Sequence, residues 1–219
     1  MIIHKVLDEV LSARSNIMVL RVLKNYQTGL TGREISRIIG ISPKASLKAL
    51  SYLEDLGMVN RIRGGRDHIF SFNRENFIVK EGILPLLESE LSYRNSLLKD
   101  ISSKLKKHSS GVYLFGSVAR KEETISSDLD ICIIYDSSAN KSVLENLVSE
   151  LKPKLYKRYG VNIAPFYISA GEFAKRAKRN KPPIPEIIND GITLFGIRIK
   201  ELINGKTVAK DKHRQIKRR

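Results

Sequence analysis

Cysteine and histidine are scarce in this chain, and their scarcity excludes two kinds of site. The 219 residues include a single cysteine, Cys132, so no disulfide can form within the chain. Cys132 lies inside an apolar segment, where a cysteine usually acts as a small core residue. The histidines have no spacing typical of a zinc site, and we assign them no chemistry. They are His4, His68, His108 and His213.

Long hydrophobic runs are missing as well. No apolar segment is long enough to cross a bilayer, and the first residues lack the pattern of a signal peptide. We therefore expect a cytoplasmic protein. The length allows one large or two small domains with hydrophobic cores.

Acidic residues are outnumbered by basic ones. The chain has 39 Lys and Arg against 23 Asp and Glu, a formal net charge of +16. Residues 1–75 contain 12 basic and 7 acidic residues and residues 170–219 contain 14 and 5, whereas residues 76–169 contain 13 and 11. An excess concentrated at both ends favours a polyanionic partner, above all nucleic acid. Charge that only keeps the protein soluble is the open alternative.

The most informative segment is VYLFGSVARKEETISSDLDICIIY, residues 112–135. Its two apolar runs, residues 112–115 and 129–135, have the composition of buried strands. Between them, Gly116 lets the backbone approach a ligand closely and Ser117 offers a hydroxyl donor. The polar residues that follow are expected to begin as a helix, whose free N–H groups would face an anion. The turn therefore predicts a phosphate-binding site.

Two aspartates, Asp128 and Asp130, stand at the start of the second run. Alternate residues of a strand point to one face, so their carboxylates project together. Such a pair repels unless a cation lies between its members, and Mg²⁺ prefers oxygen ligands. A surface hairpin with two solvated aspartates is the alternative, although the alternation with leucine and isoleucine disfavours it.

The order Gly116-Ser117, ten residues, then Asp128-Leu129-Asp130 resembles the signature of the nucleotidyltransferase superfamily that includes DNA polymerase β. It is most similar to the minimal nucleotidyltransferases of bacteria and archaea, over about residues 110–196. The resemblance implies that Gly116 and Ser117 hold a nucleoside triphosphate. It also implies that Asp128 and Asp130 are catalytic and bind Mg²⁺.

One position departs from that family. The resemblance implies a third carboxylate on a later strand, residues 161–168, where this chain has Asn162. An amide can ligate a cation but cannot take up a proton at neutral pH, and general-base catalysis contributes about 10²–10⁴ in rate. Transfer could be slow, base-free, served by another carboxylate, or absent, leaving a nucleotide-binding domain. The candidate carboxylates are Glu122, Glu123 and Asp136.

The N-terminal third predicts a helix-turn-helix. After a first helix at residues 15–26, Thr31 and Glu34 form a capping box for a short helix that Gly40 ends. Ser42 and Pro43 then open a second helix as cap and first-turn residue. We expect its buried stripe to consist of Leu47, Leu50 and Leu53. We expect its outer side to carry Lys44, Ser46 and Lys48.

Residues 58–63 and 68–72 are expected to form a hairpin that completes a winged version of this motif. Residues 30–59 resemble the winged helix domains of prokaryotic transcription regulators, in which the second helix enters the major groove. The implied DNA contacts are Lys44, Ser46 and Lys48 on this helix and Arg61, Arg63 and Arg66 on the wing. A winged helix that serves only for protein association is the alternative.

Together these patterns predict an α+β protein. We expect a winged helix domain at residues 1–78, a linking helix at 79–109, a nucleotidyltransferase domain with a mixed β-sheet and flanking helices at 110–199, and a basic tail at 200–219. A basic stretch at 175–181 precedes the last strand. The linking helix is amphipathic. Its expected apolar face consists of Ile83, Leu84, Leu87, Leu91, Leu97, Leu98, Ile101 and Leu105.

Two functions fit this sequence. The first is an enzyme that transfers a nucleotidyl group from an NTP to a hydroxyl acceptor with Mg²⁺, with duplex DNA as a second partner. Minimal nucleotidyltransferases are often paired with a HEPN-type toxin, so the resemblance makes a protein target plausible. The second is a DNA-binding or antitoxin-like regulator whose transferase domain only senses a nucleotide. Winged helix proteins that bind palindromic sites are usually dimeric, which favours a homodimer in either case.

Overall fold

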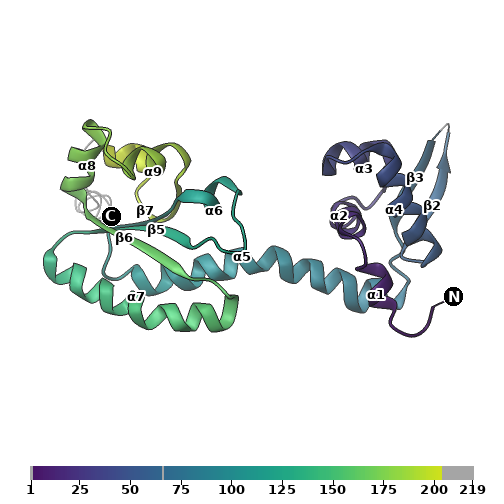
Figure 1. Cartoon of the computed structure of the whole chain (residues 1–219), viewed down its shortest axis with the longest axis horizontal. Helices are drawn as coiled ribbons and strands as arrows, with labels where there is room; N and C mark the ends of the chain where they lie inside the picture. The colour runs from purple at the N-terminus through teal and green to yellow at the C-terminus, as the bar shows by residue number, and fades with distance from the viewer. Residues whose placement is uncertain (1, 66, 204–219) are drawn as a thin grey trace, which may run out of the picture. The chain divides into compact units, whose positions relative to one another are not determined.

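The computed structural model describes residues 2–65 and 67–203, and it confirms an α+β fold (Figure 1). The chain divides into two compact units, Met1–Ser92 and Tyr93–Arg219. The predicted division into four segments, with boundaries at 78, 109 and 199, stays a prediction. Of the helices in the described residues, none has both the length and the apolar character needed to cross a membrane.

The first unit is a winged helix, as predicted. Its elements are α1 (Val6–Val10), α2 (Arg14–Leu23), β1 (Leu30–Thr31), α3 (Gly32–Ile39), α4 (Pro43–Asp55), β2 (Val59–Gly64), β3 (Asp67–Phe72), a π-helical turn (Val79–Ile83) and the start of α5 (Leu84–Leu105). The three strands pair antiparallel in the order β1-β3-β2. The two-residue strand β1 was not predicted, because it is defined only by its pairing with β3.

The predicted helix boundaries around the turn are confirmed. The Thr31 hydroxyl accepts a hydrogen bond from the Glu34 N–H (3.3 Å), and the Glu34 carboxylate accepts one from the Thr31 N–H (2.8 Å). Gly40 ends α3 in the left-handed region with φ 70°. The Ser42 hydroxyl accepts from the Ala45 N–H (3.2 Å), with Pro43 at the first helical position. Local capping chemistry thus places both helices.

The predicted faces of α4 need correction. Ser46 is fully buried and its hydroxyl donates to the Gly32 carbonyl (3.2 Å), so its placement on the outer side is wrong. Leu47 is 49% exposed and does not belong to the buried stripe. The stripe contains Ser46, Ala49, Leu50 and Leu53, the i, i+3, i+4, i+7 pattern of one helix face. A small polar side chain fits against α3 there.

The second unit contains a four-stranded mixed sheet of order β6-β5-β4-β7. After the second half of α5 its elements are β4 (Gly111–Leu114), α6 (Gly116–Arg120), β5 (Leu129–Tyr135), α7 (Ser138–Tyr159), β6 (Ile163–Ser169), α8 (Ala170–Lys178), α9 (Ile184–Asp190), β7 (Ile192–Gly196) and α10 (Ile199–Ile203). Strand β5 runs parallel to β6, whereas β4 is antiparallel to β5 and β7. The helix expected after the first strand is present as α6.

The two faces of this sheet carry different layers of helices (Figure 1). On one face, alternate residues of β4 and β5 such as Val112 and Ile131 pack against α5 and α7. On the other face, Cys132 and Ile134 pack with Phe173 of α8 and with α9. Since residues of a strand alternate, Asp130 shares the face of Cys132. The aspartate site therefore opens on the side of the sheet covered by α6, α8 and α9.

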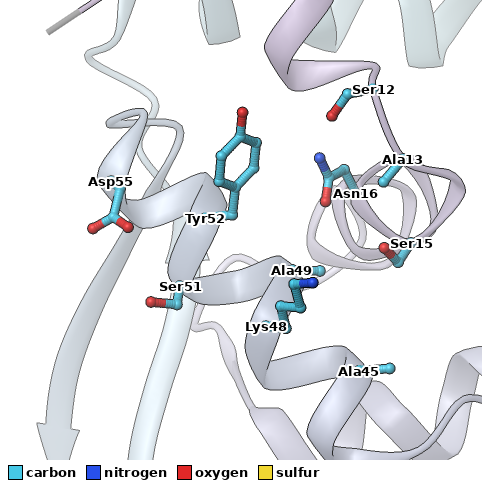
Figure 2. Close-up of a pocket in the computed structure, with 10 residues that line it drawn as sticks. All are labelled: Ser12, Ala13, Ser15, Asn16, Ala45, Lys48, Ala49, Ser51, Tyr52 and Asp55. Atoms are coloured by element: carbon cyan, nitrogen blue, oxygen red, sulfur yellow. The ribbon is translucent and has the colours of Figure 1, made fainter.

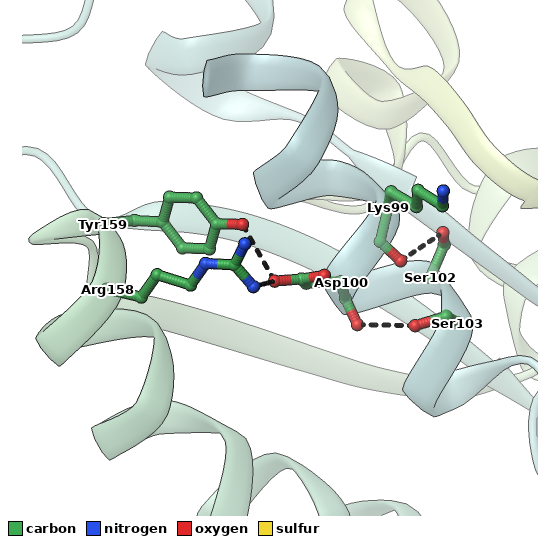
Figure 3. A network of polar contacts seen from close by, with 6 residues as sticks. All are labelled: Lys99, Asp100, Ser102, Ser103, Arg158 and Tyr159. Atoms are coloured by element: carbon green, nitrogen blue, oxygen red, sulfur yellow. Dashed lines mark hydrogen bonds and ion pairs between the residues drawn. The ribbon is translucent and has the colours of Figure 1, made fainter. Parts of the chain in front are cut away.

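A polar network joins α5 to the end of α7 (Figure 3). One carboxylate oxygen of Asp100 accepts hydrogen bonds from Arg158 Nη1 and from the Tyr159 hydroxyl, both at 2.8 Å. The Tyr159 ring packs edge-on against Tyr93 with a centroid separation of 5.6 Å. These contacts fix the two helices under the sheet. The predicted apolar face of α5 is wrong at Leu91, which is 56% exposed.

Candidate active site

The turn between β4 and α6 contacts the aspartate strand directly. The Phe115 N–H donates to the Asp130 carbonyl (3.0 Å), and Gly116 then begins α6 with φ +72°. A Cβ added to Gly116 would lie 2.2 Å from Asp130 Oδ2. Only glycine allows both this backbone conformation and this approach. The two halves of the sequence motif are thus held against each other.

The aspartates form an anionic pair. Asp130 lies on β5 and is partly buried, whereas Asp128 is exposed just before the strand, two residues away. Burial, and then the negative charges of Asp128 and Glu186, raise the pKa of Asp130, while Arg120 lowers it. Ionised Asp130 is therefore short of compensating charge. A cation bound between the carboxylates would supply it.

Ser117 is the second residue of α6 and is partly buried. Its carbonyl accepts a hydrogen bond from the Glu122 N–H (2.9 Å), which closes the chain after the helix. No side-chain cap satisfies the N–H groups at the start of α6 in the described structure. These N–H groups can therefore donate to an anion placed beside Gly116 and Ser117.

Asn162 lies beside the aspartate strand, since its carbonyl accepts a hydrogen bond from the Leu129 N–H (2.8 Å). The parallel register pairs Asp130 with Ala164, so positions 162 and 164 are the ones that border the aspartate pair. Neither residue is a carboxylate, and β6 itself, IAPFYIS, contains none. Strand β6 thus offers the site no carboxylate group that could accept a proton.

The three carboxylates expected as substitutes differ in position. Glu122 and Glu123 lie in the exposed segment after α6, and Glu122 is ion-paired to Arg120 (2.8 Å). Asp136 follows the far end of β5, where it accepts a hydrogen bond from the Ser110 hydroxyl. Six residues of strand separate it from Asp130, about 20 Å. A role for Asp136 at this site is therefore wrong.

The candidate DNA-contacting residues lie on α4 and β2. Lys44 and Lys48 are exposed on α4, and Arg61 and Arg63 are exposed on β2. Arg61 Nε pairs with Glu54 Oε1 of α4 at 3.0 Å, which ties the wing to the helix. Ser46 is buried and cannot reach DNA from this position, and Arg66 lies outside the described residues.

A cavity of about 640 Å³ lies beside Lys48, between α4 and the corner that joins α1 to α2 (Figure 2). Lys48 and Tyr52 face Asn16 and Ser12 across it. Its lining consists of Ser12, Ala13, Ser15, Asn16, Ala45, Lys48, Ala49, Ser51, Tyr52 and Asp55. The surface next to the candidate DNA contacts is therefore hollowed and mostly lined by small or polar side chains.

Residues 94–184 match the family described as "Nucleotidyltransferase domain". The chain carries a nucleotidyltransferase domain. This match covers strands β4, β5 and β6, the Gly116 turn and both aspartates, and it ends before β7.

Solved structures similar to the chain include a toxin–antitoxin with AMP-PNP (18% identity, 55% of this chain and 91% of that chain, TM-score 0.35). Others are a predicted DNA-binding transcriptional regulator from E. coli (24% identity, 38% and 83%, TM-score 0.34) and a ZitR mutant of Lactococcus lactis (14% identity, 65% and 75%, TM-score 0.32). None of the curated proteins matches the sequence.

Sequence reasoning missed three further charged residues near the aspartate pair. Arg120 ends α6, and its Nη1 lies 3.7 Å from Asp190 Oδ2 of α9. Glu186, one helical turn before Asp190, is close enough to affect the pKa of both Asp130 and Arg120. Helix α9 thus adds negative charge to the rim of the site. In the sequence, Glu186 and Asp190 are visible only as an acidic i, i+4 pair, which does not reveal that they lie near Arg120 and Asp130.

In the described residues, no three His, Cys, Asp or Glu side chains gather closely enough to hold a metal.

Proposed function

We propose that the nucleotidyltransferase domain binds an NTP at Gly116 and Ser117 and transfers its nucleotidyl group to a hydroxyl acceptor, with Mg²⁺ held by Asp128 and Asp130. The observation that carries the proposal is the contact between the Gly116 backbone and the Asp130 carboxylate. It supports a single site in which triphosphate and metal are neighbours. A hairpin with solvated aspartates would not need this glycine.

The donor set suits Mg²⁺ bound together with a nucleotide. Mg²⁺ usually keeps several waters and is held by one or two carboxylates plus substrate phosphates. Two aspartates without a third carboxylate on β6 fit that mode. The bound ion would neutralise charge on the triphosphate and orient it.

In the proposed reaction, the acceptor hydroxyl oxygen attacks the α-phosphorus and a new phosphorus–oxygen bond forms. The bond from the α-phosphorus to the bridging oxygen breaks, and pyrophosphate leaves with that electron pair. Because Asn162 and Ala164 cannot take the hydroxyl proton, it passes to water. We expect the rate to fall about 10²–10⁴-fold below that of a site with a positioned base.

The test uses α-³²P-labelled ATP, CTP, GTP and UTP with Mg²⁺ and cell lysate, beside an Asp128→Asn/Asp130→Asn variant. Label transferred by the parent protein but not by the variant would support the proposed transferase activity. Label transferred equally by both would refute the assignment of Asp128 and Asp130 as metal ligands. NTP binding is measured separately by calorimetry. A parent that does not bind any NTP with Mg²⁺ would remove the proposal altogether.

We propose duplex DNA as the partner of the winged helix, contacted through Lys44, Lys48, Arg61 and Arg63.

A second candidate function is a DNA-binding or antitoxin-like regulator whose transferase domain senses an NTP without turning it over. The missing carboxylate at 162 and 164 favours that candidate. NTP binding without any transfer, combined with a change in DNA affinity when NTP is added, would select it over the enzyme. We further propose a HEPN-type toxin as a protein target of this chain, and a homodimer as its assembly.

A further inference from the structure

Helix α8 and the turn after it carry a dense cluster of positive charge. The cluster consists of Lys175, Arg176, Lys178, Arg179 and Lys181. Its one acidic neighbour on the helix is Glu172, whose carboxylate pairs with Arg176 Nε at 2.9 Å. In the part of the chain that the structure describes, the other four cations form no ion pair. They are therefore available to a ligand.

The fold presents these cations outward. Phe173 is fully buried against the sheet, with Ala170 and Ala177 packed beside it, so that the opposite side of α8 carries Lys175 and Lys178. The same sheet face holds Asp130, and the cations thus lie on the side of the domain where the proposed site opens.

The end of α8 is fixed by backbone hydrogen bonds. Asn180 adopts φ 52°, its N–H donates to the Ala177 carbonyl (3.2 Å), and the Lys181 N–H donates to the Arg176 carbonyl (3.1 Å). This is the Schellman arrangement, in which asparagine can replace glycine. Cations in a last helical turn also interact favourably with the helix dipole. That interaction does not account for Arg179 and Lys181, which follow the helix.

A continuous layer of helices connects this surface with the aspartate pair. Helix α8 packs on α9, and α9 packs on α6, which begins at Gly116. Asp128 and Asp130 lie at the start of β5, and α8 begins next to the end of β5, since Tyr135 pairs with Ser169. Six residues of strand separate the two ends, about 20 Å. A strand that runs from the start of α8 to the aspartates would therefore span about six stacked nucleotides at 3.4 Å each.

We propose that the surface of Lys175, Lys178, Arg179 and Lys181 binds the phosphodiester backbone of a nucleic-acid acceptor. The acceptor's terminal hydroxyl then lies at the aspartate pair, and transfer extends the strand by one nucleotide with release of pyrophosphate. This inference rests on the proposed transferase function and names its acceptor. Several cations along one helix and the turn after it suit a partner with regularly repeated negative charge.

The test compares two triple variants of the full-length protein. In Lys175→Ala/Lys178→Ala/Arg179→Ala, the proposed surface loses three charges. The matched control, Lys152→Ala/Lys154→Ala/Lys157→Ala, loses three exposed charges from α7 on the opposite face of the sheet. Both variants keep the winged helix intact, so its own binding to nucleic acid cancels in the comparison.

The first readout is binding of a fluorescent 20-nucleotide strand, as RNA and as DNA, across salt concentrations. Three lost phosphate contacts should reduce the slope of log affinity against log salt by about 2 for single strands. The advantage of the parent over the α8 variant should then be about 20-fold larger at 50 mM than at 200 mM salt. Equal salt slopes for the α8 and α7 variants would refute the proposal that the α8 cations bind nucleic acid.

The second readout is transfer of label from α-³²P-NTP to the same strands. The α8 variant should raise the KM for the strand and leave NTP affinity unchanged. Label that enters a lysate protein but neither strand would overturn a nucleic-acid acceptor, with NTP binding and the transferase function intact. A parent protein that does not bind NTP would instead refute the transferase function. Calorimetry measures this binding independently of the salt slopes.

Discussion

Replacing Gly116 by alanine should disable the nucleotide site at a modest cost in stability. The residue has φ +72°, a conformation that costs a residue with a Cβ about 1–2 kcal/mol. The new Cβ would also lie 2.2 Å from Asp130 Oδ2, where a carbon and an oxygen need about 3.3 Å. The carboxylate must therefore move by about 1 Å. Oxygen ligands of Mg²⁺ tolerate about 0.2 Å, so the metal position is lost.

Gly160 offers a matched control in the same unit. Its φ is +67°, and nothing lies within 4 Å of a Cβ placed there. Gly160→Ala should thus carry the same backbone cost without the collision. Both variants should lose about 1–2 kcal/mol of unfolding free energy in urea. Only Gly116→Ala should lose Mg²⁺-dependent binding of a non-hydrolysable NTP analogue, and any transfer should slow by about 10²-fold.

The comparison between the two glycine variants decides the point. Calorimetry with the analogue measures binding, and urea titration measures stability. If Gly116→Ala binds nucleotide and Mg²⁺ as the parent does while both variants show the same stability loss, the contact between the turn and Asp130 has no role in ligand binding.

Four further outcomes are expected. Because the pKa of Asp130 is raised, the free energy of unfolding without metal should fall as pH rises above the ordinary aspartate pKa of about 3.9. Asp130→Asn should remove this fall and should raise stability at pH 7 in EDTA. The same variant should abolish the stabilisation by Mg²⁺ in thermal melts. Asp100→Ala should cost about 1 kcal/mol in urea, since two donors lose their acceptor, without altering NTP binding. Ser46→Ala should cost about 1 kcal/mol and leave DNA affinity unchanged, and an affinity loss without unfolding would contradict its buried position. Lys48→Ala should instead keep stability and reduce the salt slope of duplex binding by about 1, and an unchanged slope would remove Lys48 from the interface.

Features set by short stretches of sequence were predictable. The capping box of Thr31 and Glu34 and the end of α3 at Gly40 depend on residues three to nine positions apart, and the structure has both. The proximity of Asp128 to Asp130 likewise depends only on two positions at the start of β5, and the charge of Asp128 affects the pKa of Asp130. These local rules compete with few alternatives, so sequence patterns suffice to predict them.

Features set by packing between elements were missed. A buried stripe of Leu47, Leu50 and Leu53 predicts Ser46 on the outer side of α4, but the close approach of Gly32 gives the Ser46 hydroxyl a buried acceptor. The hydrophobicity of Leu47 predicts a core residue, although its position on the helix points it outward. The sequence of α8 predicts only a basic stretch, since its single large apolar residue, Phe173, gives too weak a periodicity to indicate a helix.

The aspartate site combines features set by a short stretch of sequence with a feature set by packing between distant elements. Gly116 and both aspartates come from one hairpin-like segment, β4-α6-β5, so their spacing in sequence carries the geometry. The third position comes from β6, which the chain reaches only after the 22 residues of α7. Sequence pointed to Asn162, but the parallel register adds Ala164, directly opposite Asp130. With both positions unable to take a proton, binding of the nucleotide and turnover become separable properties of this chain. A comparison of NTP affinity with transfer rate therefore distinguishes a slow transferase from a nucleotide sensor, whereas the fold of the domain is common to both.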